Sequence, residues 1–213
     1  MSQSVVITDS AAMLQAAIAT LDAGGTTYEC LPDGLTPEEV AARSADADVL
    51  IVACGTDTPR VAAMAGARVP LKESPGVLVH TTPMPATLDR VVLSPIAHMK
   101  QKPDGRIVTG SGFGGTPTAD ASREAGERFL RTASRMLPVL GESVVEKVTL
   151  GFRPLPQDEF PVIGFAPKRR DVCITVMHSG VTLSPLVAQL AAIEILDGVD
   201  AEPLSPYRPA RFN

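Results

Sequence analysis

An arginine in a turn is the residue of this sequence best suited to binding an anionic small molecule. Arg153 stands in the segment Gly151-Phe152-Arg153-Pro154, which leads out of an expected strand. A guanidinium can donate two parallel hydrogen bonds to one carboxylate, so an arginine at the mouth of a turn is a candidate for holding a substrate carboxylate. The alternative is an arginine that only lies at the surface beside a turn, and the local sequence leaves both interpretations open.

The histidines and Ser179 narrow the range of possible chemistry. His80, His98 and His178 have no metal-ligand spacing, which argues against a metal site. His98 lies on an expected strand, where alternation decides which face of the sheet it takes. His178 and Ser179 lie in a strand-to-helix turn, where His178 could equally cap backbone groups. Ser179 has no spaced His/Asp partners and no nucleophile elbow, so acyl transfer is not indicated.

A buried strand and a helix position the turn at His178-Ser179-Gly180. Residues 172–177 form a largely β-branched apolar run, typical of a strand covered on both faces. Helical spacing from Leu186 to Leu196 predicts a helix with Pro185 in its first turn. At such a strand end, free N–H groups and the helix dipole bind anions and cofactors. The alternative is an ordinary corner in which Gly180 only permits the turn.

A second segment repeats this order of strand, glycine and helix. The apolar run from Val49 to Cys54 ends at Gly55, and Thr58-Pro59 predicts the start of a short helix. Earlier in the chain, Thr36-Pro37-Glu38-Glu39 predicts a capping box that opens another helix. Short strands are expected at Val5 to Ile7 and Thr26 to Cys30. These elements together predict an α/β fold.

The middle of the chain predicts an antiparallel sheet. The turn Pro103-Asp104-Gly105 joins expected strands at His98 to Lys102 and Arg106 to Thr109 into a hairpin. Further strands are expected at Val77 to Thr81, Val91 to Ser94 and Val144 to Leu150, and a helix at Asp120 to Met136.

One glycine-rich segment in this region matches a nucleotide-binding pattern. The segment from Gly110 to Gly115 satisfies G-x-G-x-x-G, but Thr116-Pro117 interrupts the helix that should follow, and the preceding strand belongs to a hairpin. A flexible connection is therefore favoured over a dinucleotide loop.

Composition excludes several classes of partner. The 213 residues carry a net charge of −5 without a long Lys/Arg block, which argues against nucleic acid or an anionic membrane surface as partner. Cys30, Cys54 and Cys173 form no CxxC motif and are expected to be reduced, which favours a cytoplasmic location. We expect neither a signal peptide nor a membrane-spanning segment.

Four segments, taken together and in order, resemble a known family. They are Ala47 to Gly55, His98 to Gly105, Gly151-Phe152-Arg153-Pro154 with Pro161-Val162-Ile163-Gly164, and His178 to Pro185. This order is similar to the carboxyl-terminal part of the D-amino-acid oxidase and glycine oxidase family of FAD-dependent amine oxidoreductases. The resemblance runs from about Ala45 to Leu196, and four ordered motifs are far more specific than one.

The resemblance implies roles for individual residues. Arg153 matches the arginine that holds the substrate carboxylate, and His98 stands where the family often has a pocket-facing Tyr. Ten residues are thereby assigned to the site, two toward the substrate and eight toward FAD. The eight expected cofactor-binding residues are Ala53, Cys54, Gly55, His178, Ser179, Gly180, Val181 and Thr182.

One part of the family's pattern is missing. The amino-terminal βαβ unit, whose glycine-rich loop holds the FAD pyrophosphate, has no counterpart, and residues 1–45 resemble the elements that follow it. We therefore expect an FAD-binding part in residues 1–75 and 145–213, and an antiparallel substrate-domain sheet in residues 76–144. The strands at 49 and 172 are expected to lack neighbours, and an exposed apolar sheet edge is unfavourable. This favours a second subunit that carries the dinucleotide-binding unit.

The expected function is therefore that of one subunit of a two-chain FAD-dependent oxidoreductase. It would oxidise the C–N bond of a small amine or amino acid by hydride transfer to the flavin. One alternative is a non-catalytic interaction subunit that keeps the fold without the cofactor, and a weaker one is a truncated gene product. The substrate and the electron acceptor are not predicted.

Overall fold

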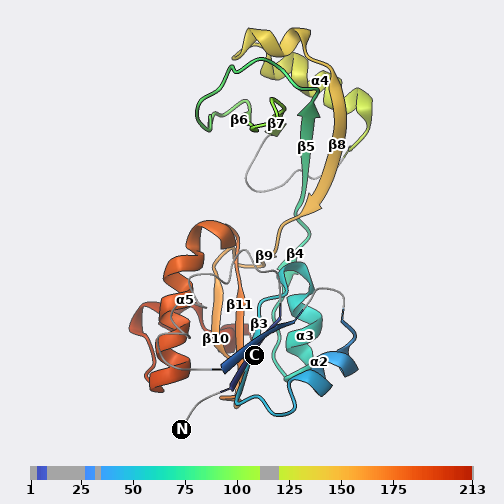
Figure 1. Cartoon of the computed structure of the whole chain (residues 1–213). Helices are drawn as coiled ribbons and strands as arrows, with labels where there is room; N and C mark the ends of the chain where they lie inside the picture. The colour runs from blue at the N-terminus through green and yellow to red at the C-terminus, as the bar shows by residue number, and fades with distance from the viewer. Residues whose placement is uncertain (1–3, 9–26, 32–34, 111–119, 213) are drawn as a thin grey trace. The chain divides into compact units, whose positions relative to one another are not determined.

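The computed structural model describes residues 4–8, 27–31, 35–110 and 120–212, and these form two units. The first unit combines residues 1–72 with 154–213, and the second comprises residues 73–153. Each has its own sheet (Figure 1). The expected helix after Val5 to Ile7 and most of the glycine-rich segment 110–115 lie outside the described residues.

A five-stranded sheet forms the centre of the first unit. Its order is β10-β11-β3-β1-β2, with β11, β3, β1 and β2 parallel and β10 antiparallel to β11. The fold is thus α/β, as expected from the strand, glycine and helix order of the sequence. The strands are β1 (Ser4–Thr8), β2 (Thr27–Leu31), β3 (Val49–Val52), β10 (Val162–Phe165) and β11 (Val172–Val176).

The expectation that the strands at 49 and 172 lack neighbours is wrong. β3 pairs with β11 on one side and with β1 on the other, and β11 lies between β3 and β10. β1 and β2 therefore take the two sheet positions beyond β3. The sequence that follows β1, Asp9-Ser10-Ala11-Ala12, contains no glycine. The sheet is extended, but by a strand without the glycine loop that binds a pyrophosphate.

Helices cover both faces of this sheet (Figure 1). Strand residues alternate between the faces, which explains why both faces are apolar in the central strands. One face packs against α3 (Thr58–Met64) and the other against α5 (Gly180–Asp197). On one face, Val52 and Ile174 of the sheet pack in one cluster with Val61 and Ala62 of α3. On the other face, Val49 and Cys173 pack with Ile195 of α5.

The short helix α2 (Pro37–Arg43) begins as the sequence predicts. Thr36 Oγ1 accepts a hydrogen bond from the Glu39 N–H at 3.3 Å, and Glu39 Oε2 accepts one from the Thr36 N–H at 2.8 Å. Each side chain thus satisfies a backbone donor that the first turn of the helix leaves without an acceptor. This confirms the predicted capping box.

The helix α5 begins earlier than expected, so Pro185 lies inside the helix and not in its first turn. Proline has no N–H to donate to the carbonyl four residues before it. Here that carbonyl belongs to Val181, and Ser184 Oγ donates to it at 3.0 Å. The neighbouring serine therefore replaces the hydrogen bond that Pro185 removes.

The apolar face of α5 also differs from the prediction. The helical spacing of Leu186, Leu190, Ile193 and Leu196 predicts that these residues form the apolar face. Instead Val187, Ala191 and Ile195 are buried, and Leu186 and Ile193 are exposed. By length and composition α5 could cross a membrane, contrary to the expectation that no segment approaches that length. One such helix is weak support for a membrane location, because a helix that packs on the core of a globular protein meets the same criteria.

The chain ends in two short 3₁₀ helices, η3 (Glu202–Tyr207) and η4 (Pro209–Phe212). A buried ion pair fixes this tail: Glu194, 2% exposed, accepts hydrogen bonds from both terminal nitrogens of Arg208, one at 2.7 Å. Glu194 also accepts the Ala201 N–H at 2.7 Å. Gly164, with φ +125°, gives the Arg208 side chain room beside β10.

The second unit has an antiparallel sheet in the order β6-β7-β5-β8. One face packs against α4 (Arg123–Ala133) through Val79, Leu130 and Val145. The β6/β7 hairpin confirms the predicted turn at Pro103-Asp104-Gly105. The strands are β5 (Pro75–Thr81), β6 (His98–Gln101), β7 (Ile107–Gly110) and β8 (Val145–Phe152).

Two expected strands in this region turn out differently. β8, which we placed in the cofactor-binding part, pairs along its length with β5 and lies instead in the second unit. The segment Val91 to Ser94 forms only an isolated bridge from Val92 to Met99. The remaining short strands, β4 (Leu71–Lys72) and β9 (Leu155–Pro156), pair with each other in the first unit.

Candidate functional site

The two turns expected to meet a cofactor lie at one edge of the first unit's sheet. β3 and β11 are adjacent and parallel, with Val52 opposite Ile174. The segments that follow them, Ala53 to Gly55 and His178 to Thr182, therefore leave the sheet at the same edge. In open α/β sheets, ligands bind at the carboxyl ends of the strands. The structure thus brings together the eight residues predicted to bind the cofactor.

The turn after β3 is open at its glycine. Gly55 has φ +56°, and no atom lies within 4 Å of where its Cβ would stand. A side chain here would be strained by the left-handed backbone and not by crowding. Thr58 follows, and its buried Oγ1 has no hydrogen-bond partner among the described residues. A ligand at this edge would find space at the glycine and an unused hydroxyl group.

The turn after β11 leads directly into α5. Ser179, the residue before the helix, has φ 61°, and its side chain forms no capping hydrogen bond. Its Oγ lies 2.8 Å from His178 Nδ1. The first N–H groups of a helix have no acceptor within the helix, and the dipole makes this end positive. Val181, the second residue of α5, is 80% exposed, so a ligand can reach it.

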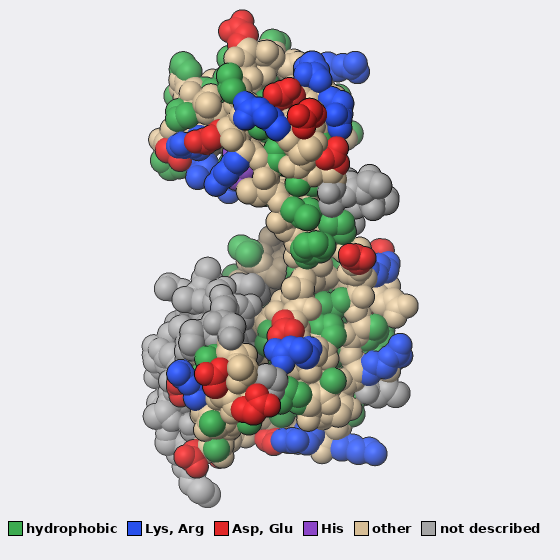
Figure 2. Space-filling view, turned by 90° about the vertical axis from the view of Figure 1, so that its right-hand side faces the viewer, with side chains coloured by type: hydrophobic (Ala, Val, Ile, Leu, Met, Phe, Trp, Pro, Cys, Tyr) green, Lys and Arg blue, Asp and Glu red, His purple; other side chains and the backbone are tan. Residues whose placement is uncertain are grey.

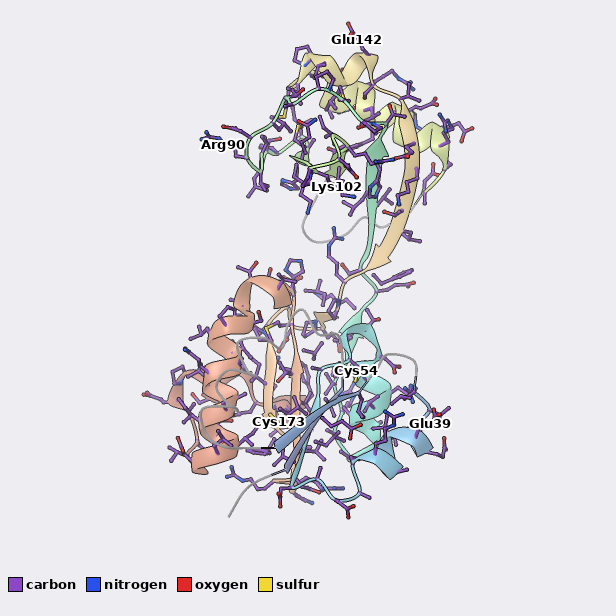
Figure 3. All side chains as sticks on the ribbon, viewed as in Figure 1. Glu39, Cys54, Arg90, Lys102, Glu142 and Cys173 are labelled. Atoms are coloured by element: carbon purple, nitrogen blue, oxygen red, sulfur yellow. The ribbon has the colours of Figure 1, made fainter. Side chains whose placement is uncertain are left out.

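The two described cysteines of this unit differ in environment (Figure 3). Cys54 is half-buried in the turn after β3, whereas Cys173 is fully buried in β11. Burial, with a smaller contribution from the Glu194 carboxylate, raises the pKa of the Cys173 thiol to about 12. Cys173 is therefore a packing residue with no thiolate chemistry. Among the described residues no group of three His, Cys, Asp or Glu side chains could hold a metal.

Arg153 belongs to the second unit and lies against β5. Its backbone N–H donates to Ser74 O at 2.9 Å, and Nη1 donates to Pro75 O at 3.3 Å. The guanidinium lies where the side chain of Gly76 would be: a Cβ there would be 2.6 Å from Cζ. Residues 76, 78 and 80 share one side of the strand. Arg153 therefore lies on the side of the sheet that Leu78 and His80 occupy.

His98 lies on this same side of the sheet. Its neighbour Met99 is buried in the core cluster with Ala133 of α4, so alternation directs half-buried His98 away from α4. We call this side the distal face. It comprises Gly76, Leu78 and His80 of β5, Val108 and Gly110 of β7, His98 and Lys100 of β6, and Lys147 and Thr149 of β8.

His80 also belongs to the distal face, although the sequence suggested no role for it once its spacing had argued against a metal site. Its Nε2 lies 3.0 Å from Thr149 Oγ1 on the neighbouring strand. Burial lowers the pKa of His80, and the positive charges of Lys147 and Lys102 lower it further. The period-two pattern that places Leu78 and His80 on one face was present in the sequence.

Comparison with known proteins identifies the family of this chain. The family of FAD dependent oxidoreductases matches residues 2–193. The chain belongs to this family. FAD is the family's cofactor, and the resemblance inferred from four sequence motifs is confirmed.

Individual relatives are longer than this chain. One of the subunits of opine oxidase from Agrobacterium tumefaciens is 29% identical over 165 residues, which are 77% of this chain and 43% of that protein. Hydrogen cyanide synthase subunit HcnC of Pseudomonas aeruginosa is 30% identical over 172 residues, 76% of this chain and 40% of that protein. Among solved structures, L-proline dehydrogenase from P. horikoshii superposes with a TM-score of 0.66 at 25% identity, covering 77% of this chain and 46% of that chain. The chain thus spans less than half of these relatives.

The residues present fit one part of FAD and not another. The edge formed by the turns after β3 and β11 offers an open glycine, the unused Thr58 hydroxyl and the start of α5. These suit the ring portion of a flavin, which needs close backbone approach and N–H donors. The pyrophosphate needs a glycine-rich loop, and the sequence after β1 has none. Gly110, which begins the other glycine-rich segment, ends an antiparallel strand.

Proposed function

We propose that this chain is one subunit of a two-chain, FAD-dependent oxidoreductase that oxidises the C–N bond of a small amine or amino acid. The observation that carries the proposal is the shared edge of the turns after β3 and β11 in a chain of the FAD-dependent family. The distal face of the second unit adds Arg153 and His98 as candidate substrate residues.

The names of two relatives support the second chain in this proposal. Two relatives are named as subunits, of opine oxidase and of hydrogen cyanide synthase, and this chain spans 43% and 40% of them. A partner carrying G-x-G-x-x-G would supply the pyrophosphate contacts that the Asp9-Ser10-Ala11-Ala12 segment does not offer. An exposed edge at β3 no longer supports a partner subunit, because β3 has neighbours on both sides.

Bound FAD would supply the acceptor for the hydride that leaves the carbon beside the substrate amine. The tasks of this chain are binding and orientation. Arg153 pairs with the substrate carboxylate through its two-pronged guanidinium, and His98 borders the substrate. The N–H groups at the start of α5 and the helix dipole favour negative charge beside the turn at His178 to Thr182.

The test is to purify the chain alone and together with a candidate partner that carries the glycine-rich loop, and to record the absorbance spectrum of each. We expect no flavin in the chain alone and a yellow complex that amino acids bleach under anaerobic conditions. Gly55→Val is the matched variant: it strains the turn after β3 and should lower the flavin content of the complex.

Two results would count against the proposal. A soluble, flavin-loaded chain without a partner would rule out the two-chain arrangement. A complex that forms without flavin would favour the alternative of a non-catalytic interaction subunit that retains only the fold.

A further inference from the structure

The charged residues of the distal face are all positive. Among its nine residues are Lys100 and Lys147, two histidines and no Asp or Glu. Figure 2 shows Lys and Arg side chains gathered beside a histidine on the surface of residues 73–153. A protein with a net charge of −5 therefore has a locally cationic face on one of its sheets.

The register arranges these groups in one row across four strands. Lys147 of β8 is opposite His80 of β5, His80 is opposite Val108 of β7, and Val108 is opposite Lys100 of β6. Cross-strand neighbours share a face and stand about 5 Å apart. Lys147 is therefore the direct neighbour of His80 on one side. On the other side, Val108 lies between His80 and Lys100.

The two lysines of this row have no counter-charge in the described part of the chain. Neither Lys100 nor Lys147 forms a salt bridge there, whereas Lys102 pairs with Asp104 at 3.5 Å. The nearby carboxylates are already engaged: Glu146 and Asp104 both pair with Arg106. Figure 3 labels Lys102 beside the β6/β7 hairpin. The positive charges of Lys100 and Lys147 on either side of His80 are thus not paired with a carboxylate in the described part of the chain.

Arg153 lies on the same face at a distance along β5. Its guanidinium lies over Gly76, four residues before His80. At about 3.3 Å per residue, the two positions are about 13 Å apart along the strand. Arginine and lysine side chains each extend several ångströms from the backbone, so one small molecule can meet both groups.

From this row we propose that the substrate carries a second carboxylate, bound by Lys147, His80 and Lys100, besides the one at Arg153. The inference rests on the proposed function and deepens it: the substrate class is an amino acid or secondary amine with two carboxylates. Charge-assisted hydrogen bonds to such a group contribute both affinity and orientation.

The test compares dicarboxylates with their neutral monoamides in the purified complex. Glutamate with glutamine, and iminodiacetate with its monoamide, differ at one carboxylate only. Two readouts are recorded for each pair: binding by calorimetry, and anaerobic flavin reduction. We expect tighter binding and a higher kcat/KM for the dicarboxylate of at least one pair.

The variant Lys100→Met/Lys147→Met should weaken binding of that dicarboxylate about tenfold and leave its monoamide unchanged. The matched control is Lys72→Met, which removes a positive charge from the other unit, where Lys72 pairs with Glu159 at 2.7 Å. Equal losses for dicarboxylate and monoamide, or no preference for any dicarboxylate, would overturn the second-carboxylate site. If no amine reduces the flavin but dicarboxylates bind, the proposed oxidation fails and the binding site stands.

Discussion

The guanidinium of Arg153 occupies the space that Gly76 leaves free on β5. A Cβ at position 76 would lie 2.6 Å from Cζ and 2.7 Å from Nη2, closer than such atoms approach in proteins. The orientation of the arginine therefore depends on a residue 77 positions earlier in the sequence. A substitution at Gly76 therefore tests the position of the Arg153 guanidinium.

Arg153→Ala should weaken binding of a substrate that carries a carboxylate. A charge-assisted hydrogen bond contributes about 1.5–3 kcal/mol, so one lost bond raises the apparent Kd about ten- to hundredfold. Arg153→Lys should recover only part of this loss, since lysine lacks the planar fork. The measurement is turnover of an amino acid and of the matching amine without a carboxylate. Equal harm to both substrates would contradict a carboxylate role.

Gly76→Ala tests the position of the Arg153 guanidinium without changing Arg153 itself. It should displace the guanidinium and raise KM for the amino acid while the Tm changes little, because the end of a long side chain can move. If Gly76→Ala behaves as the wild type, the guanidinium position is not important for binding.

His98→Ala should change substrate affinity or preference and leave the flavin content of the complex unchanged. The reason is its place on the distal face, on a strand of the second unit, whereas the predicted flavin turns belong to the first. His178→Ala is the control, since His178 lies in the turn after β11 and should affect flavin content. Loss of flavin from His98→Ala, or unaltered kinetics with every substrate, would argue against the assignment.

The lowered pKa of His80 predicts a dependence of stability on pH. Burial and then Lys147 and Lys102 disfavour its protonated form in the folded protein. The unfolded chain therefore takes up a proton first, at an ordinary histidine pKa of about 6.5, and stability falls as the pH drops below that value. Denaturant midpoints above and below that pH should differ less in His80→Gln than in the wild type. Identical pH dependence in both would exclude the effect.

Arg208→Met should destabilise the first unit strongly. It leaves the carboxylate of Glu194, 2% exposed, without its charged partner, and breaking a buried pair costs about 3–5 kcal/mol. The control is Arg170→Met, whose pair with Asp200 is exposed at both side chains and should contribute less than about 1 kcal/mol. Chemical denaturation checks both. Equal losses from the two variants would show that the Glu194 pair has no special weight.

The sequence by itself determined the features that depend on neighbouring residues. The Thr36 capping box, the hairpin at Pro103-Asp104-Gly105 and the strand at 172–176 follow from local hydrogen bonding and side-chain periodicity. The order of four short motifs also sufficed to identify the family, because four motifs in one order are far more specific than any single motif.

The tertiary structure alone decided which strands pair and which face each side chain takes. β1 beside β3, β8 beside β5 and Pro185 inside α5 were each missed. Strand pairing depends on packing between residues far apart in sequence, which a local pattern does not contain. The row of Lys147, His80 and Lys100 exists for the same reason: it combines three strands whose register is set by the burial of the opposite face against α4.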